Sequence, residues 1–156
     1  MSSHSFSITN TWTGNTGSGT ASYDSYERSH EFGSPGKPSI PGSASPAYKG
    51  DADRYNPEEM LLGAVSACHM LWYLHLCAEA GVVVSSYTDK VSGELNMNAD
   101  GSGEFDSITL GPAVEVSPNS DLDLAHSLHN DAGRMCFIAR SLRCEIIHRP
   151  QISVAK

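Results

Sequence analysis

The chain contains 156 residues, and its 18 acidic side chains outnumber its 10 Lys and Arg side chains, which gives a formal net charge of −8 at pH 7. This length is typical of one domain, and the acidity gives no general electrostatic reason to bind nucleic acid or an anionic membrane surface. Four cysteines are too few for a small disulfide-stapled secreted scaffold. The N-terminal residues do not resemble a secretory signal. We therefore expect a single domain over residues 1–156, located in the cytoplasm, with no nucleic-acid or membrane partner.

The first region, residues 1–55, is rich in Ser, Gly, Thr and Pro. Alternating apolar and polar residues predict one strand from Phe6 to Trp12 and a second from about Ala21 to Phe32. Four prolines and three glycines between residues 33 and 46 then predict irregular backbone. A disordered tail is the alternative, but the aromatic residues of this region indicate that most of it packs.

A long helix is predicted over residues 56–81. Asn56 is a good N-cap, Pro57 suits the first helical position, and the two glutamates that follow suit the positive end of the helix dipole. The segment from Met60 to Ala78 has no formally charged residue, but two histidines interrupt it and no Lys or Arg closely flanks it, which argues against a membrane span. A helix that is apolar on all sides is buried on all sides. Because a chain of this size can rarely surround a helix, we expect a second subunit to cover part of it.

The remaining residues, 82–156, are predicted to form a hairpin, a shorter helix and a final strand. Alternating apolar and polar residues predict strands over residues 87–97 and 108–116, and Pro112 favours an edge position or a bulge in the second of them. The final strand is expected near residues 142–146. Strands joined as hairpins, with too few helices to cover both faces of a sheet, predict an α+β fold.

The cysteines are the candidate chemical groups. Cys68 lies in the middle of the predicted long helix, and Cys136 lies at the end of the second helix. No two cysteines have Cys-x-x-Cys spacing, which excludes a local zinc-ribbon or thioredoxin-type motif. Any of the four can be read as a buried small apolar side chain, and this is our interpretation of Cys77 and Cys144.

Histidines near Cys68 raise the question of a metal site. His75 follows Cys68 by seven residues, about 10 Å along a helix, which is too far for both side chains to bind one ion. His69 points about 100° away from Cys68 around the helix. His126 and His129 have the spacing of a chelating pair, but we expect their face to be solvated. The sequence therefore predicts no metal site.

The residues around Cys68 resemble those of a known family. The stretch Asn56-Pro57-Glu58-Glu59-Met60-Leu61-Leu62, followed by Ala64-Val65-Ser66-Ala67-Cys68-His69, is similar to the helix signature of the OsmC/Ohr family of thiol peroxidases. That family pairs an Asn-Pro-Glu helix start with a cysteine ten residues after the glutamate. A second cysteine follows a shorter helix, and here Ala125-His126 and Cys136 lie in that region. The resemblance covers essentially the whole chain.

This resemblance implies both a fold and an activity. The fold would be α+β and OsmC-like, with antiparallel strands, a long central helix and a second shorter helix, in an intertwined homodimer with active sites at the subunit interface. The activity would be reduction of organic hydroperoxides, and less efficiently of hydrogen peroxide. Cys68 would be the peroxidatic cysteine and pass through a sulfenic acid, and Cys136 would close a disulfide with it. No cofactor is implied, and the reductant would be a dithiol, for which a lipoyl group is one candidate.

Two further residues correspond to the family pattern. The Asn-Pro-Glu glutamate falls on Glu58, and the arginine of the N-terminal strand falls best on Arg28, with Arg54 as a rival. A free cysteine is only a few per cent thiolate at pH 7, and the helix dipole helps little in mid-helix, so Cys68 needs a cation. An arginine stays charged when desolvated, and Glu58 would hold its guanidinium in a planar fork.

The spacing of this set has a consequence for the assembly. Glu58 and Cys68 lie about 15 Å apart along one straight helix. Either the partner chain supplies Glu58 to the site or the helix bends.

One residue departs from the family pattern. Phe137 stands where a proline commonly follows the second cysteine, which leaves the geometry of Cys136 open. The alternative function is a non-catalytic dimer of the same fold that binds a small molecule or senses redox state, with Cys68 merely buried.

Overall fold

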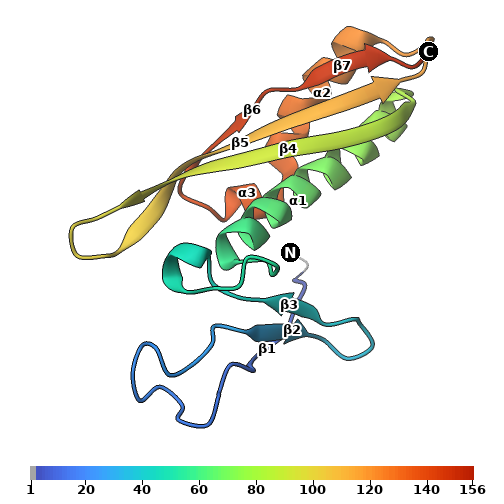
Figure 1. Cartoon of the computed structure of the whole chain (residues 1–156). Coiled ribbons are helices and arrows are strands. Elements are labelled where there is room, and N and C mark those ends of the chain that lie inside the picture. The colour runs from blue at the N-terminus through green and yellow to red at the C-terminus, as the bar shows by residue number, and fades with distance from the viewer. Residues whose placement is uncertain (1–2) are drawn as a thin grey trace. The chain divides into compact units, whose positions relative to one another are not determined.

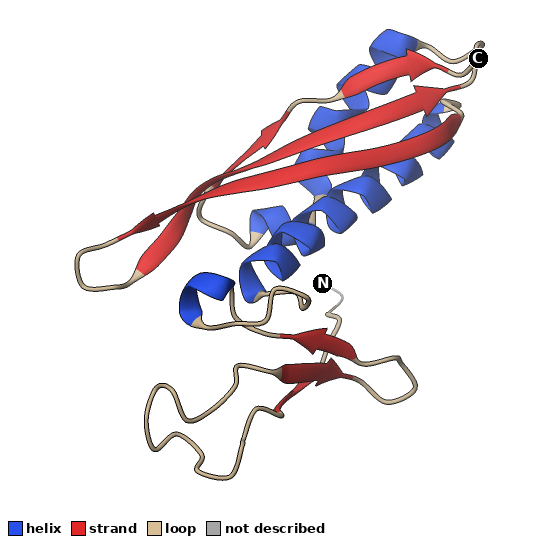
Figure 2. Cartoon of the chain, viewed as in Figure 1, coloured by secondary structure: helices blue, strands red, loops and turns tan. Residues whose placement is uncertain are grey.

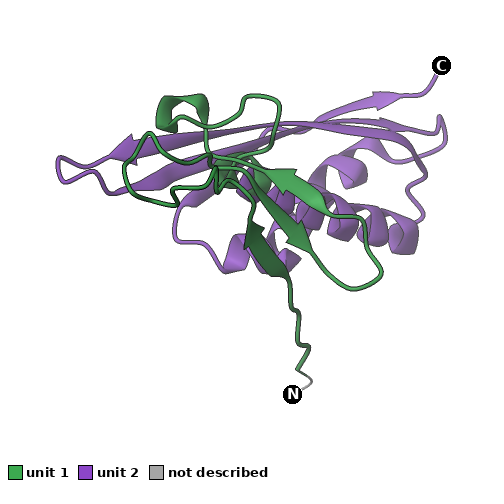
Figure 3. Ribbon diagram, turned by 60° about the horizontal axis from the view of Figure 1, so that its bottom comes forward, with its two compact units in different colours: residues 1–60 green, residues 61–156 purple. Residues whose placement is uncertain are grey.

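Two sheets form in different parts of the chain (Figure 1). The computed structural model describes residues 3–156 and divides into two compact units, residues 1–60 and 61–156 (Figure 3). The boundary falls in the first turn of the long helix. The two units are described separately.

The first unit contains a small antiparallel sheet in the order β1-β2-β3. Its elements are β1 (Thr9–Trp12), β2 (His30–Gly33), β3 (Ile40–Gly42) and a 3-10 turn, η1 (Pro46–Tyr48). The predicted second strand is therefore much shorter than expected, because the chain turns before it. The Oδ1 atom of Asn15 accepts from the N–H groups of Gly17 and Gly19, and such local side-chain bonds compete with strand pairing. β3 forms despite Pro41 because it is an edge strand, where a missing N–H is tolerated.

The long helix α1 (Pro57–Ala80) matches the prediction closely. Asn56 Oδ1 accepts from the N–H of Glu59 at 2.9 Å, and Glu59 Oε2 accepts from the N–H of Asn56 at 3.1 Å. This reciprocal capping box satisfies two donors that a helix start leaves free. Gly81, with φ of 75°, then ends the helix in the left-handed conformation that glycine tolerates best.

The second unit is a four-stranded sheet with both long helices on one face (Figures 2 and 3). β4 (Val84–Met97) and β5 (Gly103–Val116) form the predicted hairpin. β6 (Glu145–His148) and β7 (Gln151–Val154) both pair with β5 in parallel, so the chain crosses over rather than making a second hairpin. Pro112 lies in the central strand, at the point where the neighbouring strand is interrupted between β6 and β7.

The crossover contains α2 (Leu122–Met135) and the short α3 (Phe137–Arg140). Asp121 caps α2, and its side chain accepts from the N–H of Leu124 at 2.9 Å. The α+β architecture, with one long central helix and one shorter helix, is confirmed.

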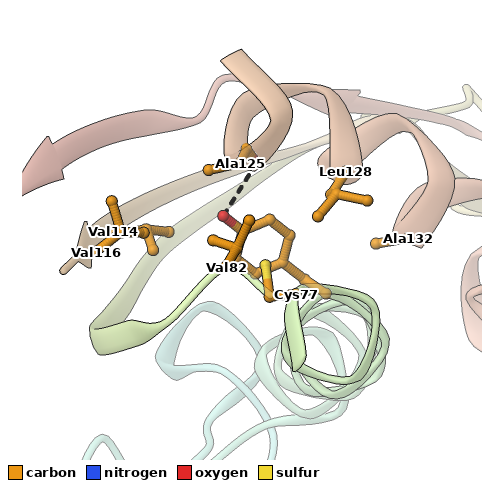
Figure 4. Close-up of a cluster of buried hydrophobic side chains, with 8 residues drawn as sticks. Cys77, Val82, Val114, Val116, Ala125, Leu128 and Ala132 are labelled. Atoms are coloured by element: carbon orange, nitrogen blue, oxygen red, sulfur yellow. Dashed lines mark hydrogen bonds between the residues drawn. The ribbon is translucent and has the colours of Figure 1, made fainter. Parts of the chain in front are cut away.

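The core of the second unit has two clusters. One lies between the C-terminal half of α1, the sheet and α2; its members are Tyr73, Cys77, Val82, Val114, Val116, Ala125, Leu128 and Ala132 (Figure 4). The other contains Val65, Ile108 and Leu110 and packs against Ile138, Leu142 and Ile146. The tyrosine of the first cluster donates its hydroxyl to the carbonyl of Ala125 at 3.0 Å.

The single chain buries α1 along one side only. Its buried residues are Val65, His69, Tyr73 and Cys77, which form one stripe at four-residue spacing. Leu71, on another face, is 64% exposed. The helix is long and apolar enough to cross a membrane, but here it is the core helix of an α+β fold.

Candidate functional site

Cys68 and Cys136 are far apart in the sequence and adjacent in the structure. Cys68 lies on α1, and Cys136 occupies the junction where α2 ends and α3 begins. Their side chains lie close enough for Cys68 to influence the pKa of Cys136, and both thiols are free. The packing of α2 against α1 therefore brings together the two cysteines singled out by the sequence.

The two thiols differ in their surroundings. Cys136 is fully buried, whereas Cys68 is half-buried. The Cys136 Sγ atom accepts from the N–H of Ala139 at 3.4 Å and lies 4.0 Å from the carbonyl oxygen of Val65. Burial raises the pKa of Cys136 to about 11, the neighbouring Cys68 side chain adds to the rise, and the N–H group of Ala139 opposes it. Cys136 is thus a protonated thiol at neutral pH.

An aromatic residue follows each of these two cysteines along the chain. Trp72 lies one helical turn after Cys68 and meets the ring of Phe137 edge to face, with 5.6 Å between centroids. Phe137 directly follows Cys136 and is 67% exposed. A shallow apolar depression of about 210 Å³ is lined by Leu71, Trp72 and His75. Trp72 and Phe137 therefore form an apolar ring pair between the two segments that carry the cysteines.

Arg28, the preferred candidate for activating cation, is held within the first unit. Its guanidinium lies 4.2 Å from the ring centroids of both Tyr23 and Tyr26. It donates to the carbonyl oxygens of the same two residues, at 2.7 and 2.5 Å. The structure describes no ion pair between Arg28 and Glu58 in residues 3–156.

Arg54, the rival candidate, has a different environment. Its Nε atom lies 3.5 Å from Asp51 Oδ2, and its Nη1 atom is buried without a hydrogen-bond partner. Glu58 is half-buried in the first turn of α1. The helix is continuous from Glu58 to Cys68, so the two residues of one chain stay about 15 Å apart along its axis.

Two buried histidines, His69 and His129, form a cluster with the half-buried His148 that the sequence did not predict. The prediction that His129 is solvated is wrong: His129 is 1% exposed and His69 is fully buried. The Nε2 atom of His69 and the Nδ1 atom of His129 are hydrogen-bonded at 3.0 Å, and the His148 ring lies 4.6 Å from the His69 ring. His129 lies between Ala125 and Ala132 on the apolar face of its helix, and this spacing was the signal that could have placed it inside.

The cluster is neutral in the folded state. Burial, with a smaller contribution from the neighbouring imidazoles, lowers the pKa of His69 to about 4 and that of His129 to about 3. Burial also lowers the pKa of His148, which Asp89 partly offsets. In residues 3–156, no group of three or more His, Cys, Asp or Glu side chains is arranged to hold a metal ion.

The other two cysteines lie away from this pair. Cys77 is in the first core cluster, where burial raises its pKa. Cys144 is half-buried, packs against the second cluster and also borders a polar hollow of about 560 Å³ that Asn96, Glu104 and Arg143 help to line.

Comparisons with known proteins agree with this architecture. The family model described as "OsmC-like protein" matches residues 50–149. An OsmC-like protein of unknown function from Vibrio cholerae is 31% identical, with a TM-score of 0.84 over 97% of this chain and 100% of that one. No curated protein matches the chain.

Two solved structures named for organic hydroperoxide resistance share the fold at lower identity. The protein from Elizabethkingia anophelis is 18% identical, with a TM-score of 0.67 over 97% of this chain and 99% of that one. OhrB of Bacillus subtilis is also 18% identical, with a TM-score of 0.58 over 95% and 98%. At this identity the likeness is one of fold.

Proposed function

Because the chain belongs to the OsmC-like family, we propose that it is a thiol peroxidase that reduces organic hydroperoxides, and hydrogen peroxide less efficiently. The observation that carries this proposal is the contact between the Cys68 and Cys136 thiols. One thiolate reduces the peroxide by two electrons and becomes a sulfenic acid, and a second thiol that can meet it closes a disulfide; here one thiol is half-buried and the other is buried beside it.

The chemistry has two steps. The Cys68 thiolate attacks one peroxide oxygen, the O–O bond breaks, and the alkoxide takes a proton and leaves as an alcohol, which gives Cys68 sulfenic acid. The sulfur of Cys136 then attacks the sulfur of Cys68, the S–O bond breaks, and hydroxide leaves with the Cys136 proton as water. A dithiol, for which a lipoyl group is one candidate, restores both thiols by exchange. The protein needs no bound cofactor for this cycle, and the cytoplasm would supply the reductant.

The assignment of roles follows from the environments. Cys68 is the more accessible thiol, so it meets the peroxide first. Cys136, with its raised pKa and buried sulfur, reacts only with the group placed beside it. The edge-to-face rings of Trp72 and Phe137 favour a peroxide with an apolar substituent.

A second copy of the chain completes the site in this proposal. On α1, one exposed face carries Gly63, Ala64, Ala67, Leu71 and Ala78, with the exposed His75 at its edge. Small residues with one leucine let two helices approach closely. A homodimer that covers this face would bury the apolar residues of α1 that the single chain leaves exposed. The partner subunit could then bring its own glutamate at position 58 to Cys68. Arg28 or Arg54 would supply the positive charge, and the unpaired Nη1 atom of Arg54 keeps it a strong rival.

Substitution at the exposed face tests the dimer. Leu71→Glu should place charges on that face and convert the dimer into monomer, as measured by light scattering after gel filtration. Asn130→Glu, on the exposed side of α2, is the matched control and should leave the mass unchanged. A wild-type chain that is a monomer at all concentrations would refute the dimer.

The peroxidase proposal is tested by three variants and a dithiol-coupled assay with cumene hydroperoxide. Cys68→Ser should abolish turnover. Cys136→Ser should consume one equivalent of peroxide and stop as a sulfenic acid that dimedone traps. Cys144→Ser, also a half-buried cysteine, is the control and should keep full activity. Turnover by Cys68→Ser would refute the proposal. A Cys68–Cys136 disulfide that forms slowly and that no dithiol recycles would favour the redox-sensing alternative instead.

A further inference from the structure

The two helices that carry the reactive cysteines are joined in the core by a second, separate contact. His69 directly follows Cys68 on α1, and His129 precedes Cys136 by seven residues, two turns, on α2. Their imidazoles are hydrogen-bonded at 3.0 Å with their ring planes inclined by 9°. The contact therefore fixes α1 against α2 close to the point where the two thiols meet.

We propose that the His69–His129 pair is a protonation-sensitive tie that positions α1 against α2, so that the Cys68–Cys136 disulfide closes while the imidazoles are neutral and is disfavoured when they are protonated. The proposal rests on the proposed function, because it concerns the same two cysteines. His69 and His129 are positioning residues, because they act on the thiols through the placement of the two helices.

Neutral imidazoles are required by the geometry of the contact. In an N–H···N bond, one ring donates and the other offers a lone pair. If both rings were protonated, two N–H groups would face each other at 3.0 Å and the bond would be lost. The second nitrogen of each ring, Nδ1 of His69 and Nε2 of His129, is buried without a partner, so a proton added there would be buried without an acceptor.

The surroundings offer little to stabilise a positive charge. On α1, the ring of Tyr73 stacks on His129 at 3.8 Å, and on α2 His126 adds a like charge when protonated. From β6, His148 faces both members of the pair, and its Nε2 atom is also buried without a partner.

Strand β4 supplies Tyr87 and Asp89. The Asp89 carboxylate acts on His148 rather than on the pair, and its oxygens already accept from Ser66 Oγ at 2.6 Å and from the N–H of Gly111 at 2.8 Å. The Tyr87 hydroxyl is buried without a partner, and burial raises its pKa, so it is neutral. Protonation of the pair therefore has to be relieved by admitting water, which separates α1 from α2.

Such a separation matters for the disulfide more than for the individual thiols. A disulfide requires the two sulfurs to approach about 2.05 Å with narrow limits on the Cα–Cα distance, so a small displacement of one helix prevents closure. An acidified protein would then keep both thiols, and reduction would be favoured over oxidation.

The test measures the equilibrium between the reduced protein and its Cys68–Cys136 disulfide in a dithiothreitol buffer, with a selenol catalyst, approached from both directions and quenched with acid. Below the pKa values of all the thiols this exchange consumes no net protons, so its constant is independent of pH unless another group is coupled to it. For the wild-type protein, we expect the constant to fall about tenfold between pH 5 and pH 3, in the direction of the reduced form, because the pKa of His69 in the reduced protein is about 4.

Two variants and one control make the test specific. His69→Gln/His129→Gln keeps hydrogen-bonding side chains that cannot titrate, and its constant should change by less than about twofold over the same range. His129→Gln alone serves if the double variant does not fold, and it should reduce the pH dependence. His75→Gln, an exposed histidine on the same helix, should behave as wild type.

Three results would overturn the proposal: a wild-type constant that does not vary with pH, an unchanged pH dependence in the glutamine variants, or a loss of it in His75→Gln. A purely structural role would lower the stability of the variants without altering the pH profile.

Peroxide turnover at pH 7 is measured separately. If turnover fails while the dithiol equilibrium shifts with pH, only the proposed function is wrong, and if turnover is normal while the equilibrium is flat, only the tie is wrong.

Discussion

The two units of this chain bury different kinds of residue. In residues 3–60, the buried positions are Gly14, Gly42 and Ser43, and none is a large apolar side chain. Phe6 is 95% exposed and Tyr55 is 64% exposed. In residues 61–156, by contrast, two clusters of fully buried apolar side chains lie between one face of a sheet and two helices.

This difference shows where the stability of one chain resides. Burial of apolar surface is the dominant favourable term in folding, so the second unit holds most of the folding free energy of the single chain. The first unit is held by local turns and by the contact of Arg28 with Tyr23 and Tyr26. Its exposed aromatic residues fit a segment that gains its stability from a further surface, as the proposed homodimer would provide.

The largest expected contrast between the units comes from deleting one aromatic side chain in each. Tyr73→Ala removes a fully buried ring and its hydrogen bond to Ala125, and should lower the free energy of unfolding by about 3–5 kcal/mol. Phe6→Ala should change it by less than about 0.5 kcal/mol, because the ring is almost fully exposed. Urea denaturation at pH 7 measures both. Equal losses would show that the first unit shares a core that the single chain does not reveal.

Acidification should weaken the second unit selectively. In the folded protein the pKa of His69 is lowered to about 4 and that of His129 to about 3, whereas the ordinary value is 6.5. The unfolded chain therefore binds protons at a higher pH than the folded protein does. Stability is therefore complete above about pH 6.5 and falls as the pH drops towards 4, by at most about 3 kcal/mol for His69 alone.

Denaturation curves at several pH values check this expectation. His129→Gln should flatten the decline, and His75→Gln, which changes an exposed histidine of the same helix, should not. A wild-type stability that stays constant down to pH 4 would contradict the buried, neutral state of the cluster.

A smaller effect is expected at the start of α2. The Asp121 side chain accepts from the N–H of Leu124, so Asp121→Ala should cost about 1 kcal/mol. Asp123→Ala, in the first turn of the same helix but without the capping bond, should cost less, and thermal unfolding monitored by circular dichroism compares the two. If the two substitutions cost the same, the cap contributes nothing beyond its charge near the helix dipole.

The strongest sequence signals were those with a local cause. Asn56, Pro57 and Gly81 act within a few residues of themselves, and α1 begins and ends within one residue of the prediction. The alternation along β4 and β5 likewise located the hairpin, because a half-buried strand has a period of two.

Features that depend on distant partners could not be found in this way. The parallel pairing of β6 and β7 with β5 is set by the path of α2, which no local pattern records. Of the strand expected from residue 21 to residue 32, only the last part forms, in β2, because the Ser25 hydroxyl bonds to Gly19 and Ser22 and turns the chain before it.

Only part of the site was predicted, because the rest of it depends on contacts between elements that are far apart in the sequence. The family resemblance pointed to Cys68 and Cys136, and the fold places their thiols in contact. His129 and His148 were missed because a polar side chain on an apolar face is found only when its partners, here on another helix and a strand, are known.

The central claim, that Cys68 and Cys136 form a peroxide-reducing pair, is tested most directly by the intact mass of the reduced protein after one equivalent of cumene hydroperoxide, followed by peptide mapping. We expect a loss of two hydrogen atoms and a single crosslinked peptide that joins Cys68 to Cys136. An unchanged mass with the peroxide still present, or a crosslink that involves Cys77 or Cys144, would contradict it.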